Sequence, residues 1–278
     1  MLILLLAVAL DPTAHAREVA RKLPFAHDAM LELRREAGAI SDPALRAAVE
    51  AQILAPWLPS EAWAYAHLAE ARKLLGEPEL QLPPQRKGDF GAAPGGACEE
   101  SHHGYPGGLA VHSLANLLHA RALAKVYEHV YGIHLDDGAL VAAAIWHDSL
   151  KAATLPWQQD GSCGPEPKIA GTPGHHVLGL AAGILRHLPK DLLITIAAAH
   201  DPQKACDWLQ AASILATGEK TTCPPVRTEG YITHFADADY ELTGVAWKRY
   251  IEKAPKGWAR YDALQFDGNE LLLFSRSP

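Results

Sequence analysis

The spacing of apolar residues is helical over most of this chain. Between residues 11 and 76, apolar positions recur three or four apart in sequence rich in Ala, Leu, Glu and Arg, as at Val19 and Leu23. This period predicts several amphipathic helices in the first part of the chain. The same criterion predicts further helices at 108–131, 137–148, 175–188, 190–200 and 227–243.

Two segments rich in proline and glycine interrupt this pattern. Residues 77–96 read as a connector and residues 155–173 as a loop. Near the end, Tyr261–Phe266 and Glu270–Ser275 flank the turn-forming residues Asp267-Gly268-Asn269. That arrangement predicts two short strands joined by a tight turn. The expected fold is therefore mainly α, with a small C-terminal β-hairpin.

The chain begins with ten apolar residues, MLILLLAVAL. This run is too short to span a bilayer, so no transmembrane segment is expected. One interpretation is a buried first helix that breaks at Asp11-Pro12. The other is a secretory signal with a small-x-small step at Ala14–Ala16, although no basic residue precedes the run. We expect a cytoplasmic protein, with export as the alternative.

Composition narrows the class of protein. The chain has 278 residues, of which 49% are hydrophobic and 21% charged, and this balance excludes a disordered or fibrous protein. Lys and Arg number 25 against 32 Asp and Glu, a net charge of -7. No extended nucleic-acid partner is expected, whereas a small phosphorylated substrate is compatible if a metal supplies local positive charge.

The cysteines and histidines point to different kinds of site. The four cysteines form no C-x-x-C pair, so a zinc ribbon is excluded. A disulfide scaffold is not expected at this chain length, although one or two disulfides stay open if the protein is exported. The chain also has 15 histidines, many of them between residues 102 and 200. Histidine is the commonest metal ligand and the usual acid or base near neutral pH.

A histidine and an aspartate follow a run of small and apolar residues that ends at Trp146. A buried helix would deliver His147 and Asp148 together at its last turn. Both could bind one cation, and the carboxylate could bridge to a second. Candidate partners lie on other predicted helices: His112, His175, His200 and Asp237. Each alone is consistent with an ordinary core or capping residue, but the ordered set favours a site.

The same residues resemble the HD superfamily of metal-dependent phosphohydrolases. Residues 102–113, HHGYPGGLAVHS, are similar to the motif HH-x-Y-x-GGL-x-x-H-[ST] of a branch that includes the HD portion of bacterial exoribonucleases. HDSLK at 147–151 is similar to the HD-x-x-K signature, and Gly174-His175, His200 and the segment 225–237 follow in order. Asp201 departs from this branch, which has histidine there. The OB-fold of that branch has no counterpart in the helical N-terminal sequence.

The resemblance implies an architecture and a ligand set. It implies a helical HD bundle at 93–253, preceded by a helical extension and connector at 1–92 and followed by a tail with the hairpin at 254–278. It further implies one or two divalent cations, of iron, manganese or zinc. The implied ligands of the first are His112, His147, Asp148 and Asp237, and Asp148 would bridge to a second bound by His175 and His200.

The activity implied by the resemblance is hydrolysis of a phosphomonoester or phosphodiester of a small, nucleotide-like substrate by metal-activated water. Asp148 and Lys151 would be catalytic. Substrate contacts would come from His103, Lys151, His176 and Arg227. Two alternatives keep the same fold: a mixed-valent di-iron oxygenase similar to myo-inositol oxygenase, and a signalling module without catalysis.

Overall fold

In a computed structural model of the chain, the structure describes residues 11–56, 66–83, 88–99, 101–238 and 240–267. The N-terminal part contains α1 (Pro12–Lys22), α2 (Pro24–Gly38), α3 (Pro43–Leu54) and α5 (Leu68–Leu75). The middle contains α6 (Gly108–Tyr131), α7 (Asp137–Trp146), α8 (Lys151–Thr154), β1 (Lys168–Ile169) and β2 (Thr172–Pro173). The remainder contains α9 (Gly174–Leu185), α10 (Lys190–Ala198), α11 (Ala205–Thr217), α12 (Thr228–Asp237), α13 (Tyr240–Ile251) and α14 (Ala259–Asp267).

Helices α1, α3 and α7 begin where the sequence supplies a capping aspartate. Asp11 and Asp42 accept hydrogen bonds from backbone N–H groups of the first turns of α1 and α3, and proline follows each of them. Asp136 caps α7 in the same way. These side chains satisfy donors that have no partner within a helix, and proline suits the first helical position because its ring fixes φ. The prediction of a mainly α fold is confirmed.

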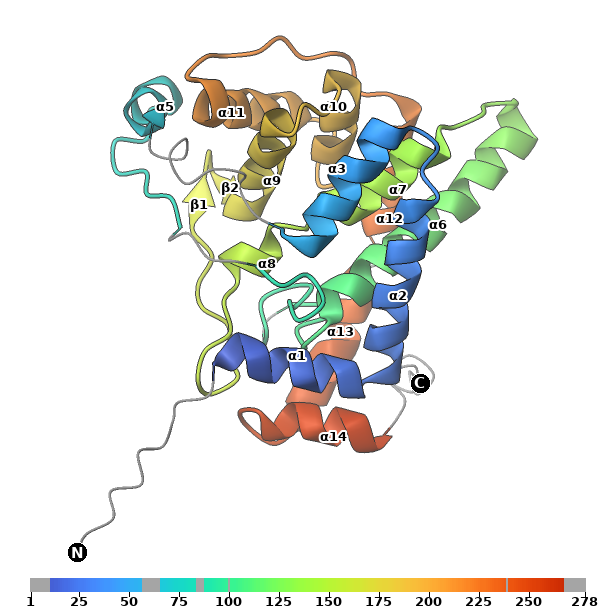
Figure 1. Ribbon diagram of the computed structural model, residues 1–278, viewed down its shortest axis with the longest axis vertical. Helices are drawn as coiled ribbons and strands as arrows, with labels where there is room; N and C mark the ends of the chain where they lie inside the picture. Colours follow the sequence, from blue (N-terminus) through green and yellow to red (C-terminus); the bar gives the residue numbers. More distant parts are fainter. Residues whose placement is uncertain (1–10, 57–65, 84–87, 100, 239, 268–278) are drawn as a thin grey trace, which may run out of the picture.

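The helices pack around α6, which runs diagonally through the molecule in Figure 1. It contacts α2, α7 and α12, while α9, α10 and α11 pack on one another at the top of that view. Buried residues of α2 and α3, such as Leu33 and Val49, belong to the same apolar core as Trp146 of α7 and Leu193 of α10. The N-terminal helices therefore share a core with the helices that carry the candidate ligands.

The chain's one described sheet is not where the sequence pattern placed it. Strands β1 and β2 pair antiparallel with Ile169 opposite Thr172, just before α9. Residues 261–266, predicted as a strand, lie in α14, so this prediction was wrong. Tyr261 and Leu264 are three residues apart and both are buried in a cluster with Ala16 of α1, which fits a helical period and not an alternating one. The second predicted strand lies outside the described residues, as does the apolar run at 1–10.

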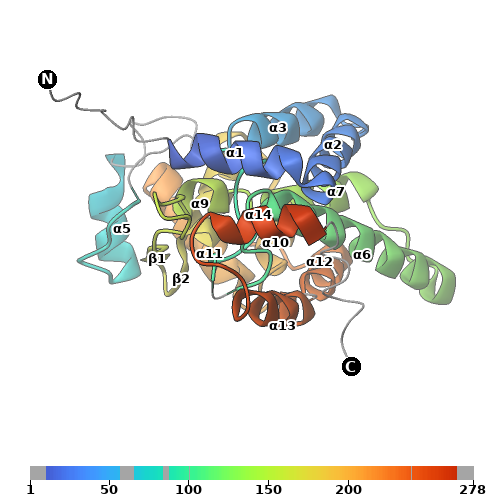
Figure 2. The same ribbon diagram turned by 90° about the horizontal axis from the view of Figure 1, so that it is seen from below.

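Helices from opposite ends of the chain close one end of the molecule. Helix α14 contacts α1, and the two lie side by side in both ribbon views (Figures 1 and 2). The helix predicted at 227–243 is two helices, because α12 ends at Asp237 and α13 begins at Tyr240. Helix α11 was not among the predicted elements. Within the part of the chain that the structure describes, no helix has both the length and the apolar character needed to cross a membrane.

All four cysteines are paired. Disulfides join Cys98 to Cys163, with Cα atoms 5.5 Å apart, and Cys206 to Cys223, with Cα atoms 5.7 Å apart. The first connects the loop before α6 to the loop before α9. The chain thus has two disulfides, although a disulfide scaffold was not expected at this chain length.

The loop before α6 approaches its own backbone closely at two glycines. A Cβ atom at Gly104 would overlap the carbonyl of Cys98, and one at Gly108 would overlap the carbonyl of His103. The loop is also held by the indole of Trp247, which donates to the Cys98 carbonyl at 2.6 Å. The path of the loop into α6 therefore depends on residues without a side chain at these two positions.

Candidate metal centre

The six predicted ligands come together from five separate helices. His112 lies on α6, and His147 and Asp148 directly follow α7. The others are placed by helix ends: His175 in the first turn of α9, His200 just after α10, and Asp237 at the last position of α12. Five of the six are buried, and His200 is partly so. Residues more than a hundred positions apart in the sequence thus form one polar cluster inside an apolar core.

Four of these side chains direct their donor atoms at one point. His112 Nε2 lies 3.3 Å from His147 Nε2, 3.1 Å from Asp148 Oδ2 and 3.1 Å from Asp237 Oδ1. His147 Nε2 lies 3.5 Å from the same oxygen of Asp148 and 3.6 Å from that of Asp237. We call this set the first donor group.

A second donor group lies on the other side of the Asp148 carboxylate. Asp148 Oδ1 lies 3.1 Å from His175 Nε2 and 3.5 Å from His200 Nε2. Asp237 also reaches this side, with Oδ2 3.6 Å from His200 Nδ1. The two oxygens of Asp148 therefore face different groups, the arrangement expected of a carboxylate that bridges two cations.

The donor set fits divalent cations. Neighbouring donors around one cation at bond lengths of about 2.0–2.2 Å lie roughly 3.0–3.4 Å apart, close to the separations in the first group. Among the described residues, several of the candidate ligand atoms are buried without a hydrogen bond. Two of them, His175 Nε2 and Asp148 Oδ1, face each other at 3.1 Å. Imidazole and carboxylate without thiolate suit iron, manganese or zinc.

The charges in the cluster stabilise one another. Burial raises the pKa of Asp148, but the neighbouring Lys151 and His147 outweigh burial and hold that pKa well below its ordinary value. The pKa of Asp237 is likewise held low against burial by hydrogen bonds from His112, His147 and His200. Both carboxylates are therefore ionised and available as ligands at neutral pH.

His112 responds in the opposite sense. Burial lowers the pKa of His112, but the carboxylates of Asp148 and Asp237 raise it by more than burial lowers it, so that the pKa is about 9. The folded, metal-free protein therefore holds a proton there between pH 6.5 and about 9 that the unfolded chain has released. A bound cation would take the place of that proton, since ligation requires the neutral imidazole.

A pH dependence of stability follows. In the metal-free protein, the stabilisation from His112 is complete below pH 6.5 and is lost as pH rises through about 9. We expect the melting temperature of metal-free protein to fall across this window, and that of metal-loaded protein to fall less. Calorimetric melts with and without added metal check this. A metal-free protein that gains stability from pH 6.5 to 9 contradicts it.

Glu166 is a functional candidate that sequence reasoning missed. It lies in the loop before α9, and its Oε1 accepts hydrogen bonds from His175 Nδ1 at 2.7 Å and from the His175 backbone N–H at 2.9 Å. Such a contact fixes the tautomer of a ligating histidine and turns its Nε2 toward the metal. Its only sequence signal is a single acidic residue among prolines, at 165 and 167.

Replacing Glu166 is expected to weaken the second donor group. Glu166→Ala should lower metal affinity about 10- to 100-fold, the effect of losing a hydrogen-bond partner of a ligand. Glu166→Gln, which keeps an acceptor oxygen, should lose less. Metal affinity by competition with a coloured chelator measures both, with the exposed Glu219→Ala as control. Equal affinities in the Ala variant and the control would remove Glu166 from this role.

A cavity of about 910 Å³ opens beside the cluster. Four of the predicted ligands line it: Asp148, His175, His200 and Asp237. Two of the predicted substrate contacts, Lys151 and His176, line it as well. Lys151 is buried, and its Nζ donates to the Gly95 carbonyl at 2.6 Å and to Asp148 Oδ2. Lys151 is therefore held beside Asp148 and is not a solvated surface lysine.

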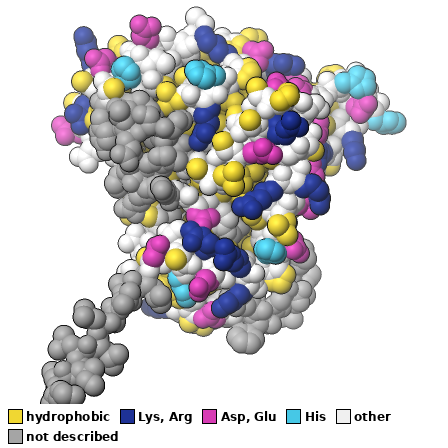
Figure 3. All heavy atoms as spheres, in the orientation of Figure 1, with side chains coloured by type: hydrophobic (Ala, Val, Ile, Leu, Met, Phe, Trp, Pro, Cys, Tyr) yellow, Lys and Arg dark blue, Asp and Glu magenta, His cyan; other side chains and the backbone are white. Residues whose placement is uncertain are grey.

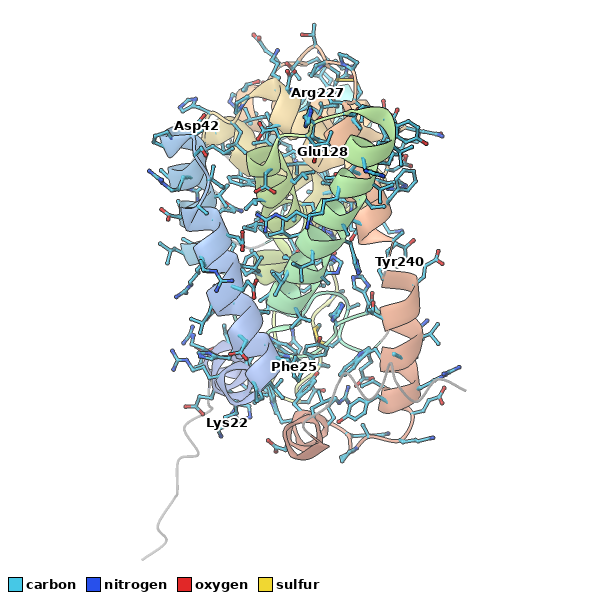
Figure 4. All side chains as sticks on the ribbon, turned by 90° about the vertical axis from the view of Figure 1, so that its right-hand side faces the viewer. Lys22, Phe25, Asp42, Glu128, Arg227 and Tyr240 are labelled. Carbon is cyan, nitrogen blue, oxygen red and sulfur yellow. A yellow bond between two sulfur atoms is a disulfide. The ribbon has the colours of Figure 1, made fainter. Side chains whose placement is uncertain are left out.

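The structure does not bring His103 and Arg227 to this cavity. His103 is buried, and its Nδ1 shares a hydrogen bond with the Tyr105 hydroxyl at 2.7 Å. Arg227 pairs with Glu229 and lies near the end of the molecule opposite Lys22, away from Tyr240, which lines the cavity (Figure 4). The neighbour of His103, His102, lines the cavity in its place, although it was not among the predicted substrate contacts.

Fold and site together define a helical protein with a buried His/Asp cluster suited to divalent cations. Comparison with the models of protein families gave no match, and comparison with solved structures gave none either. Among curated proteins, the chain is 27% identical over 146 residues to the dihydroneopterin 2',3'-cyclic phosphate phosphodiesterase of Methanocaldococcus jannaschii. The match spans about half of each protein, 52% of this chain and 51% of the relative.

Proposed function

We propose that the protein is a metal-dependent phosphohydrolase of the HD type that acts on a small phosphoester. The observation that carries the proposal is the carboxylate of Asp148, whose two oxygens face separate groups of nitrogen ligands. The similarity to a phosphodiesterase supports the same class of reaction. A metal bound there supplies a water of lowered pKa and neutralises a phosphoryl oxygen.

The residues around the cluster would have separate roles in binding metal, orienting a ligand and binding phosphate. His112, His147, Asp148 and Asp237 would hold one cation, and His175 and His200 would join Asp148 and Asp237 at a second. Glu166 orients His175. Lys151 brings an ammonium group to the cavity wall, directly beside Asp148, where it would attract a phosphate oxygen. The helices around the cluster exclude bulk water from its inner side.

The cavity suits a nucleotide-sized phosphoester with a flat ring. Its volume of about 910 Å³ falls within the range of small-molecule sites. Trp208, His176 and Tyr240 line it and place aromatic rings in its wall, where a flat ring of a substrate would make apolar contacts. Within the face seen in Figure 3, acidic and basic side chains are intermixed, so this face offers no basic track for a polynucleotide. A cyclic phosphodiester of a planar heterocycle, such as the relative's name describes, fits these features.

A substrate panel tests the proposal. Metal-loaded protein would be assayed with 2',3'-cyclic nucleotides, dihydroneopterin 2',3'-cyclic phosphate and nucleoside monophosphates, with elemental analysis of the protein beforehand. We expect bound iron, manganese or zinc and conversion of a cyclic phosphodiester to a monoester. Oxygen consumption without phosphoester cleavage would instead assign the di-iron oxygenase reaction. A protein that binds no metal and cleaves no phosphoester would overturn the proposal.

A further inference from the structure

A histidine outside the predicted ligand set lies against the first donor group. His102 belongs to the loop before α6, and its ring packs between His112, with ring centroids 4.8 Å apart, and Tyr240, with centroids 5.6 Å apart. It lines the same cavity as Asp148 and Lys151. Its position on the cavity wall places it at the side of the cluster from which a substrate would approach.

The two ring nitrogens of His102 have different surroundings. Nδ1 lies 3.0 Å from the Ser101 hydroxyl oxygen, with which it shares a hydrogen bond. Nε2 is buried, and none of the residues that the structure describes forms a hydrogen bond with it. When Nδ1–H donates to Ser101, Nε2 keeps its lone pair, which is the state of a histidine whose second nitrogen binds a cation. A buried nitrogen without a partner calls for an explanation.

The distances allow a cation to be that partner. One ligand atom each of His102, His112 and Asp148 lie within 4.8 Å of one another. Donors on opposite sides of a cation with bonds of about 2.1 Å are roughly 4.2 Å apart, so atoms within 4.8 Å of one another need to move by only about half an ångström to bind one ion. His103 Nε2 is also buried with no hydrogen-bond partner among the described residues, but His103 does not line the cavity, and none of the groups of ligand atoms that the described residues form includes it.

We infer that His102 supplies a further nitrogen ligand to the cation held by His112 and Asp148. This inference rests on the proposed function, because it assumes that the first donor group binds metal. It assigns a role to the first histidine of the HHGYPGG segment, which the six-residue ligand set leaves unused. It also means that the loop tied by the Cys98–Cys163 disulfide contributes directly to metal binding.

The loop is built to hold this ring in place. A Cβ atom at Gly96 would lie 2.6 Å from the Ser101 hydroxyl oxygen and 2.7 Å from the His102 carbonyl oxygen. The residue after His102 is held as well, because the Gly95 N–H donates a hydrogen bond to the His103 carbonyl at 2.8 Å. The close approach of residues 95 and 96 to residues 101–103 holds the backbone from which the His102 ring projects.

The experiment compares His102→Ala and His102→Gln with the unaltered protein and with His129→Ala, which removes an exposed histidine of α6. Each protein is loaded with Co²⁺, its affinity is measured by chelator competition, and its visible absorption spectrum is recorded. The spectrum reports the number and kind of ligands independently of any activity. Circular dichroism shows whether each variant is folded.

We expect both His102 variants to bind Co²⁺ at least about 10-fold more weakly and to show an altered visible spectrum, while His129→Ala matches the unaltered protein. If a folded His102 variant keeps the affinity and spectrum of the unaltered protein, the inference is wrong and the proposed function stands. If the unaltered protein itself binds no Co²⁺, both fail. Should His102→Ala not fold, the result with His102→Gln decides.

Discussion

Replacing Asp148 by asparagine is expected to abolish metal binding and phosphoester hydrolysis together. The amide keeps the shape of the side chain but removes the negative charge that both donor groups share, so neither cation retains its bridging ligand. We expect metal content to fall to background and kcat/KM to fall at least about 1,000-fold. His147→Ala should also lower metal content and kcat/KM, because it removes a nitrogen ligand from the first donor group.

Elemental analysis and steady-state kinetics measure these two quantities. Asp207→Asn is the matched control, because Asp207 is on the surface and pairs with the exposed Lys204, at 3.6 Å. Circular dichroism should show the same helical content in all of these variants, since the substitution leaves the surrounding apolar core unchanged. Metal content equal to that of the control in both Asp148→Asn and His147→Ala would show that the cluster is not the metal site.

The second large effect is expected at Trp146, the residue before His147. Its side chain is fully buried, and its indole N–H donates to the Gly179 carbonyl of α9 at 2.8 Å. Trp146→Ala removes a large side chain from the contact between α7 and α9, which carry ligands of different donor groups. We expect a loss of about 3–5 kcal/mol in the free energy of unfolding.

Urea denaturation followed by circular dichroism checks this. Trp146→Phe keeps most of the apolar volume and loses the hydrogen bond, so it should cost less, about 1–2 kcal/mol. Leu54→Ala, at a side chain that is 72% exposed, should change stability by less than about 0.5 kcal/mol. A Trp146→Ala variant as stable as Leu54→Ala would mean that this contact does not hold the two helices together.

The sequence predicted which histidines and aspartates would lie together better than it predicted the secondary structure near the C-terminus. His147 and Asp148 end a run of small, apolar residues, and such a pattern has few interpretations other than a buried helix with a polar end. Helix α6 has the predicted bounds because glycines in the left-handed conformation, Gly107 and Gly132, lie on either side of it. In these places local chemistry and tertiary packing favour the same structure.

Other features depend on contacts that the sequence does not reveal. Residues 261–266 have apolar side chains that fit a short strand as well as a helix, and packing against α1 selects the helix. Glu166 and His102 lie in loops, where no periodicity predicts which way a side chain points. Their relation to the cluster becomes visible only when the loops before α6 and α9 are placed beside each other.

The two glycines at which the loop before α6 approaches its own backbone provide a criterion for recognising proteins built in the same way. A side chain at Gly104 or Gly108 would overlap a carbonyl group, so a homologue that places His102 against the cluster should carry glycine at both positions. The pattern Gly-x-x-x-Gly, with histidine four residues further on, is a more selective criterion for finding such homologues than the scattered His and Asp residues alone. Homologues that share the six candidate ligands but lack these glycines should have a different loop and a different cavity wall.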